Sequence, residues 1–162
     1  MAEYDRNVTM TEKQKKERLP IEDDECILFA RWLRTNHPEI EFTHIPNESR
    51  SSSKNAVVRA AKLKKMGVDR GVWDYELFIP VYDIDGEIAD YQECRIEMKR
   101  QKGGGSTVSP EQKRWQRIYA TAGIPNRVCY GASDAIVFVT EILDNVNTLD
   151  QTGQYVDLEY TE

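Results

Sequence analysis

The stretch Tyr91-Gln-Glu-Cys-Arg-Ile-Glu-Met-Lys99 decides the fold, because apolar and charged side chains alternate along it. Successive side chains of a β-strand point to opposite faces of the sheet, so this period of two predicts a strand with one apolar and one charged face. Glu97 and Lys99 lie two residues apart and therefore project from the same face. A carboxylate and an ammonium group are thus expected side by side.

A second strand is expected just before this one. Residues 75–82 are rich in Tyr, Phe, Ile and Val, and Asp85-Gly86 supplies the chemistry of a tight turn within residues 83–87. The two strands are therefore expected to form an antiparallel hairpin, in which the start of the first strand meets the end of the second. This arrangement puts Asp74 beside Glu97.

The site expected at this rim combines oxygen ligands with one amine. The carboxylates of Asp74 and Glu97, with the backbone carbonyl of Met98, are hard ligands of the kind that Mg²⁺ prefers. Such an ion leaves water free to attack a phosphodiester. Lys99 can orient or deprotonate that water and offset charge that develops on the phosphate. On spacing alone, the alternative is an ordinary solvated face.

Helical periodicity and capping residues predict the remaining elements. Residues 21–36 and 55–66 place apolar side chains at helical spacing, and Pro38 and Gly67 provide the stops. Ser109-Pro-Glu-Gln112 reads as a capping box with Pro at the first helical position. The full expected order is a helix (21–36), a strand (41–45), a helix (55–66), the hairpin strands (75–82 and 91–99), a helix (109–123), a strand (127–130) and a helix that Ser133 caps (to about 143).

Composition indicates one soluble globular domain. The chain has 162 residues, 31% of them charged, a mean hydropathy of -0.66, and no apolar run near the roughly 18–20 residues that cross a bilayer. The N-terminal segment lacks the apolar stretch of a signal peptide, so a cytoplasmic location is expected. The three cysteines form no C-x-x-C pair and predict neither a disulfide framework nor a zinc site. We expect a flexible leader (1–20), the folded domain (21–144) and an acidic, flexible tail (145–162).

The net charge of -6 is concentrated in the C-terminal part of the chain. Residues 128–162 contain seven acidic residues and no Lys or Arg, whereas residues 26–127 contain 17 basic and 13 acidic residues, a net of +4. The middle of the chain is therefore compatible with a phosphate partner, although the whole chain is acidic. The basic residues that surround the expected site in the sequence, and that are candidates for holding nucleic-acid phosphates, are Arg100, Lys102, Lys113 and Arg114.

Four motifs follow one another in residues 63–143. They are Leu63-Lys-Lys-Met-Gly-Val-Asp-Arg-Gly-Val-Trp-Asp74, Ile96-Glu-Met-Lys99, Ser109-Pro-Glu-Gln-Lys-Arg-Trp115, and Ala122-Gly123 ahead of a strand and a final helix. In this order they resemble the VRR-NUC branch of the PD-(D/E)XK nuclease superfamily, and His44-Ile-Pro-Asn-Glu48 resembles the segment after that family's first helix. The resemblance implies an α/β, restriction-endonuclease-like fold with a mixed central sheet flanked by helices.

The resemblance also implies roles for individual residues. Asp74 and Glu97 would be metal ligands with the Met98 carbonyl, and Lys99 would be the catalytic lysine. Gln112 would assist catalysis from the start of the following helix, although a capping role alone would account for it.

The family further places a carboxylate of its first helix near the metal. Glu25 is the first choice for this metal-ligand role and Glu22 the second. Acidic residues that complement the helix dipole are the alternative explanation of both.

The implied activity is that of a Mg²⁺- or Mn²⁺-dependent DNA endonuclease that hydrolyses phosphodiester bonds with an activated water. Stand-alone members of the resembled family tend to be viral or prophage proteins of this size that act on structured or branched DNA, often as homodimers. The resemblance therefore implies DNA and a second copy as partners, the host cytoplasm as the location, and neither a membrane nor a nucleotide cofactor.

Two departures from the family pattern keep other functions open. Trp73 stands where the family usually has Pro, and a long hairpin separates Asp74 from Glu97. These departures favour, as an alternative, a non-catalytic nucleic-acid-binding or adaptor protein with a nuclease-like fold. A further alternative treats the acidic tail as a DNA mimic or a partner-docking segment.

Overall fold

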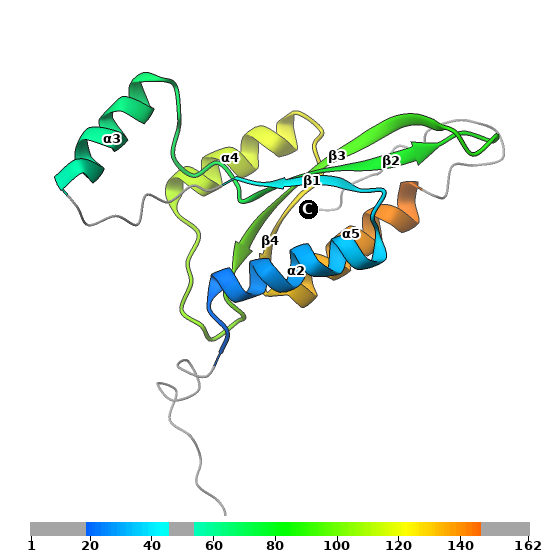
Figure 1. Ribbon diagram of the computed structural model, residues 1–162, viewed down its shortest axis with the longest axis horizontal. Coiled ribbons are helices and arrows are strands. Elements are labelled where there is room, and N and C mark those ends of the chain that lie inside the picture. The colour runs from blue at the N-terminus through cyan, green and yellow to red at the C-terminus, as the bar shows by residue number, and fades with distance from the viewer. Residues whose placement is uncertain (1–18, 46–53, 147–162) are drawn as a thin grey trace, which may run out of the picture.

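The computed structural model describes residues 19–45 and 54–146, and a four-stranded sheet forms its centre (Figure 1). The strands are β1 (Glu41–His44), β2 (Tyr75–Tyr82), β3 (Ile88–Lys99) and β4 (Asn126–Tyr130), in that spatial order. β2 pairs antiparallel with β1 and β3, whereas β4 pairs parallel with β3. The sheet is therefore mixed, because a tight turn joins β2 to β3 and a helical crossover joins β3 to β4.

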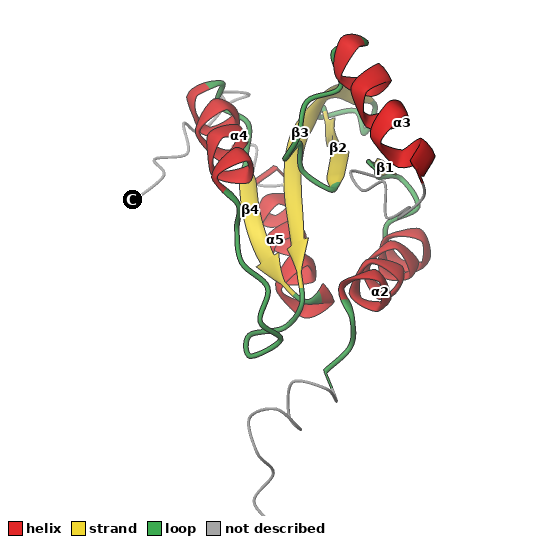
Figure 2. Ribbon diagram, turned by 90° about the vertical axis from the view of Figure 1, so that its left-hand side faces the viewer, coloured by secondary structure: helices red, strands yellow, loops and turns green. Residues whose placement is uncertain are grey.

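Helices cover both faces of this sheet. The helices within the described ranges are α2 (Glu22–Asn36), α3 (Lys54–Lys65), α4 (Pro110–Thr121) and α5 (Ala132–Val146). α2 and α5 lie together on one face, α4 lies on the other, and α3 stands apart (Figures 1 and 2). The expected α/β class, a mixed sheet flanked by helices, is confirmed.

The hydrophobic core lies between the sheet and the α2–α5 pair. Cys94, Ile96 and Met98, the apolar positions of the alternating stretch, are fully buried in one cluster with Phe29 and Leu33 of α2. A shift of β3 by one residue would turn its charged side chains into this core, so the apolar face fixes the register of the strand.

The expected elements are confirmed with changes at their ends. β3 begins at Ile88 rather than residue 91, which lengthens the hairpin. α5 begins at Ala132 and continues to Val146, past the expected domain end at residue 144. The expected capping role of Ser133 is wrong, because Ser133 lies inside the first turn and the Ala132 N–H donates to the Glu25 carboxylate at 2.8 Å.

Several expectations fall on residues that the structure does not describe. Most of the leader (residues 1–18), the end of the segment His44-Ile-Pro-Asn-Glu48 (residues 46–48) and the tail from residue 147 onward lie outside the described residues. No described helix has the length and apolar character needed to cross a membrane.

The end of the expected leader is attached to the folded domain. The Arg100 guanidinium donates to the carbonyl oxygens of Leu19 at 2.8 Å and Pro20 at 3.0 Å. This contact precedes α2 and holds its first turn near the end of β3.

Candidate active site

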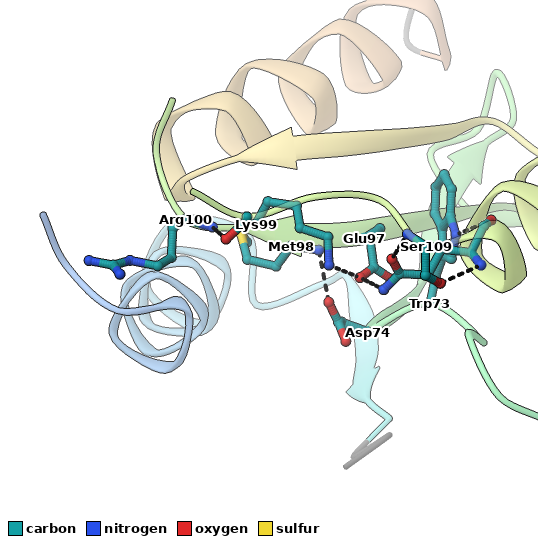
Figure 3. Close-up of polar contacts among 9 residues, drawn as sticks. Trp73, Asp74, Glu97, Met98, Lys99, Arg100 and Ser109 are labelled. Carbon is teal, nitrogen blue, oxygen red and sulfur yellow. Dashed lines mark hydrogen bonds and ion pairs between the residues drawn. The ribbon is translucent and has the colours of Figure 1, made fainter. Parts of the chain in front are cut away.

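The start of β2 and the end of β3 bring two carboxylates together. Tyr75 pairs with Ile96 across the hairpin, so the next position in the same register sets Asp74 opposite Glu97, on the face away from the core. The Asp74 Oδ2 atom accepts a hydrogen bond from the Met98 backbone N–H at 2.9 Å (Figure 3). The neighbouring carboxylates expected from the hairpin are therefore present.

The Met98 carbonyl faces the same rim. The N–H and C=O groups of one strand residue point to the same neighbour, and successive residues alternate between their two neighbours. The Lys99 carbonyl points toward β4, where it accepts from the Gly131 N–H at 2.8 Å. Met98 consequently directs its N–H and carbonyl to the opposite edge, beyond the first residue of β2. The backbone oxygen expected as a third ligand thus lies on the Asp74 side.

Glu97 and Lys99 form a buried ion pair. Glu97 is 1% exposed and Lys99 is 6% exposed. The Glu97 Oε1 atom accepts from Lys99 Nζ at 2.6 Å and also from Gln112 Nε2 (Figure 3). Glu97 Oε2, also buried, has no hydrogen-bond partner within the described residues. A buried oxygen left unpaired costs on the order of 1–3 kcal/mol, and more when it is charged, so Oε2 is suited to a cation.

Burial and neighbouring charges shift the pKa values of both members of this pair. Burial raises the pKa of Glu97 to about 8; the charge of Asp74 adds to the rise, and Lys99 opposes it. Burial disfavours the charged form of Lys99, but the hydrogen bond and charge of Glu97 outweigh that effect and raise its pKa. A carboxyl group with a raised pKa holds its proton more tightly, and a bound divalent cation would displace that proton.

Gln112 serves the helix and the site at the same time. Its backbone N–H donates to Ser109 Oγ at 3.1 Å, and its Oε1 atom accepts from the Ser109 N–H at 2.8 Å. These bonds complete the expected capping box at the start of α4. The amide nitrogen remains for Glu97. The sequence leaves capping and a site contact as alternatives for Gln112. In the structure its Oε1 atom completes the cap and its Nε2 atom donates to Glu97.

Two tryptophans hold α4 against the segment that leads into β2. Trp73 Nε1 donates to the Gln112 carbonyl at 3.1 Å, and Trp115 Nε1 donates to the Arg70 carbonyl at 3.1 Å. Trp73 donates from the segment before β2 to the backbone of α4, and Trp115 donates from α4 to the backbone of that segment. Hydrogen bonds therefore run in both directions across the contact. The buried Trp73 ring also meets Tyr119 edge-on, with centroids 5.5 Å apart. Trp73 therefore ties the start of β2 to the helical turn that carries Gln112.

The acidic residues of α2 are candidates for a further metal ligand. Glu25 is 1% exposed, and its two oxygens accept from Gln101 Nε2 at 2.9 Å and from the Ala132 N–H at 2.8 Å. Both oxygens of Glu25 thus have protein donors, and one of them caps α5; the expected metal-ligand role stays untested. Glu22, the second choice, lies near enough for its charge to act on the buried pair.

The basic candidates divide into two groups. The Arg100 guanidinium donates to the segment before α2, and its expected phosphate contact stays untested. Lys102 lies 5.9 Å over the Tyr130 ring. Lys113 and Arg114 are exposed on α4. The expected nucleic-acid contacts therefore stay predictions for Lys102, Lys113 and Arg114.

The donor set fits a hard divalent cation. Within residues 19–45 and 54–146, no three His, Cys, Asp or Glu side chains gather into a metal site. The ligands available at the rim are therefore Asp74, Glu97 and the Met98 carbonyl. Mg²⁺ usually binds one or two carboxylates and completes its shell with water and substrate phosphates. The unpartnered oxygen of Glu97 suits this mode of binding.

The whole fold can be compared with solved structures. A chain described as a "VRR_NUC domain protein" matches with a TM-score of 0.54 and 22% sequence identity, over 86% of this chain and 100% of that chain. The chain has the VRR-NUC fold. The match confirms the fold that the four motifs imply; at this identity it bears on the fold alone. No family model matches the sequence, and no curated protein matches it significantly.

Proposed function

We propose that the chain is a Mg²⁺- or Mn²⁺-dependent endonuclease that hydrolyses the phosphodiester bonds of DNA. The observation that carries the proposal is the buried Glu97 carboxylate, of which one oxygen is held by Lys99 and Gln112 and the other meets no protein donor among the described residues. Burial of that oxygen in its charged form is costly unless a cation or a proton offsets its lost hydration. The VRR-NUC fold and the four ordered motifs support a nucleic acid as the substrate.

The ligands proposed for the ion are Asp74, Glu97 and the backbone carbonyl of Met98. When bound, the ion supplies Lewis-acid activation of the water nucleophile and neutralises charge on the phosphate. The Met98 N–H orients the Asp74 carboxylate, and Gln112 orients that of Glu97. These hydrogen bonds hold the ligands before substrate arrives, which lowers the reorganisation that the reaction needs.

Lys99 is proposed to act on the water and the phosphate. Its ammonium group donates to Glu97 at 2.6 Å and therefore carries its proton in this arrangement. A protonated lysine orients the attacking water and offsets the charge that develops on the phosphate in the transition state. Of the two roles open in the sequence, orientation and charge stabilisation fit this geometry better than proton removal.

Plasmid nicking tests the proposal. The protein is incubated with supercoiled plasmid in Mg²⁺ or in EDTA, and Lys99→Ala is compared with Arg31→Ala, which removes an exposed basic residue of α2. We expect nicking only with the metal, parental activity for Arg31→Ala, and a loss on the order of 10²-fold or more for Lys99→Ala. Nicking in EDTA, or a fully active Lys99→Ala protein, would contradict the proposal. DNA binding without nicking under any of these conditions would identify the non-catalytic alternative.

A further inference from the structure

Helix α3 stands clear of the rest of the domain. It lies apart from the sheet and from the helices that cover the sheet (Figures 1 and 2). Val58 on this helix is 70% exposed, and Met66, just after it, is 68% exposed. Most helical stability in proteins comes from packing of an apolar face. The position of α3 is therefore not explained by the hydrophobic core.

The helix is strongly basic. Residues 54–65 include five Lys or Arg and no Asp or Glu. Lys62, Lys64 and Lys65 are exposed, and none of them forms an ion pair with a carboxylate in the part of the chain that the structure describes. The helix dipole favours basic residues in the last turn, but it does not account for Lys54 and Arg59 earlier in the sequence of the helix. A partner of opposite charge would account for the three exposed lysines.

The connector between α3 and β2, residues 66–73, is fixed to α4. Gly71 approaches α4 so closely that a Cβ there would lie 2.7 Å from the helix backbone. Arg114 of α4 forms an ion pair with Asp69, and the two indole hydrogen bonds close the same contact. The chain that leaves α3 is thus anchored on the helical turn that presents Gln112 to the site.

Helices α3 and α4 lie at the end of the sheet that holds the site (Figure 2). Figure 2 looks onto that end and shows α4 and α3 on either side of the strands. Exposed Lys113 and Arg117 extend the positive charge along α4, and exposed Arg70 extends it along the connector. Positive charge spread over neighbouring elements is the electrostatic pattern of contact with a phosphate backbone.

We propose that α3 is an arm that, with the basic residues at the start of α4, binds the phosphate backbone of a duplex beside the cleaved bond. The proposal rests on the endonuclease activity proposed above and gives that activity a duplex substrate. The 12 residues of α3 span about 18 Å, which corresponds to about five base pairs of B-form DNA. The contact is independent of sequence, because lysines bind phosphates as point charges. The competing occupant is a second copy of the chain docked on the exposed apolar residues.

The test measures affinity for a fluorescein-labelled DNA duplex in EDTA at several salt concentrations, so that the result does not depend on hydrolysis. The variant Lys62→Ala/Lys64→Ala/Lys65→Ala keeps the helix, because Ala has the highest helix propensity. In a plot of log Kd against log salt concentration, we expect the slope of this variant to be smaller than that of the parent by about three. The parent should then lose about 40-fold more affinity than the variant between ~50 and ~200 mM salt.

Two matched controls separate charge from other effects. The variant with all three lysines replaced by Arg should keep the parental salt dependence. Val58→Ala/Met66→Ala removes apolar surface from the same region and should leave DNA affinity unchanged. A duplex shortened by about five base pairs on one side should bind the parent more weakly but bind the triple Ala variant with unchanged affinity.

The outcomes distinguish this proposal from the proposed function. If the parent and the triple Ala variant showed the same salt dependence of DNA affinity, the proposal that α3 binds DNA would be overturned. A change of oligomeric state in Val58→Ala/Met66→Ala, with loss of DNA affinity, would overturn it in favour of a second copy on α3. If the salt dependences behave as expected and no metal supports nicking, the arm stands and the hydrolase activity is rejected.

Discussion

The two faces of β3 are buried to nearly the same degree but have opposite chemistry. On one face Ile96 and Met98 are fully buried, and on the other Glu97 and Lys99 are only 1% and 6% exposed. Burial of an apolar side chain stabilises a fold by roughly 1.5–3 kcal/mol. A buried ion pair is often no better than apolar residues of the same volume. The apolar face therefore explains the stability of the sheet, and the charged face calls for a functional explanation.

The helices that cover the two faces of the sheet differ in the same way as the faces themselves. α2 and α5 supply apolar side chains that fill the space against the sheet. α4 supplies the Gln112 amide, which meets one oxygen of Glu97 and leaves the other without a partner among the described residues. The apolar face is fully packed, whereas the charged face leaves one buried carboxylate oxygen without a protein donor among the described residues.

The largest expected effect comes from removing charge on the charged face. Glu97→Gln keeps the size of the side chain but weakens metal coordination, so nicking should fall by on the order of 10³-fold. Stability in EDTA should change little, because burial raises the pKa of Glu97 to about 8 and the amide resembles its protonated form. Initial nicking rates and urea unfolding in EDTA provide the two measurements. Parental nicking by this variant would refute the role of Glu97.

The next largest effect comes from a substitution on the apolar face of β3, at Ile96 beside Glu97. Ile96→Ala leaves a cavity in the core and should destabilise the protein by about 2–5 kcal/mol, measured by urea unfolding. Met98→Leu nearly conserves volume on the same face and should cost less than about 1.5 kcal/mol. Both proteins should nick plasmid at temperatures where they remain folded. If Ile96→Ala lost nicking without losing stability, the division between the two faces would be wrong.

A third prediction concerns the pH dependence of stability without metal. The pKa of Glu97 is about 8 in the folded protein and near its ordinary 4.5 when unfolded, so the folded state binds the proton more tightly. The resulting stabilisation is fully present below about pH 4.5 and is lost as pH rises through about 8, an effect on the order of a few kcal/mol. Urea unfolding in EDTA over this range measures it.

Glu97→Gln should flatten that pH profile, and saturating Mn²⁺ should offset the loss at high pH because the ion replaces the proton. The same profile in the parent and in Glu97→Gln would show that another group is responsible.

The smallest effect concerns the contact between α4 and the start of β2. Trp73→Phe keeps an aromatic ring near Tyr119 but removes the N–H that bonds the Gln112 carbonyl and leaves a cavity at a fully buried site, at a cost of about 1–3 kcal/mol in stability. Nicking should fall by roughly ten-fold, because a small displacement of catalytic groups slows the reaction. Trp115→Phe removes the other indole bond of the same contact at a half-buried site and should lose less stability, with less effect on nicking. Equal nicking by the two variants would leave Trp73 with a purely structural role.

Local patterns in the sequence predicted the sheet and the central pair of carboxylates. Alternation along residues 91–99 fixes which side chains share a face, and the turn at Asp85-Gly86 predicts the hairpin. The register that brings Asp74 to Glu97 also needs a shift between Val81 and Tyr82, which the turn residues did not predict. The start of α4 was also predictable, because a capping box is a short-range motif. These features depend on residues close together in the chain.

Contacts between distant elements were not predictable in the same way. Glu22 and Glu25 lie three residues apart on α2, and only the docking of α2 beside α5 decides that Glu25 caps the other helix. The roles of Arg100 and Trp73 likewise depend on partners that are 80 and 39 residues away in the sequence. Spacing along the chain carries no information about such partners.

Divalent-metal binding by the purified protein tests the central claim most directly. Titration calorimetry with Mn²⁺ is compared for the parent, Asp74→Asn and Glu97→Gln, with Glu25→Gln as a control for a buried carboxylate of α2 that lies outside the proposed ligand set. We expect a saturable site in the parent and in Glu25→Gln that is lost in both Asp74→Asn and Glu97→Gln. Absence of binding in the parent, or undiminished binding in Asp74→Asn and Glu97→Gln, would contradict the claim.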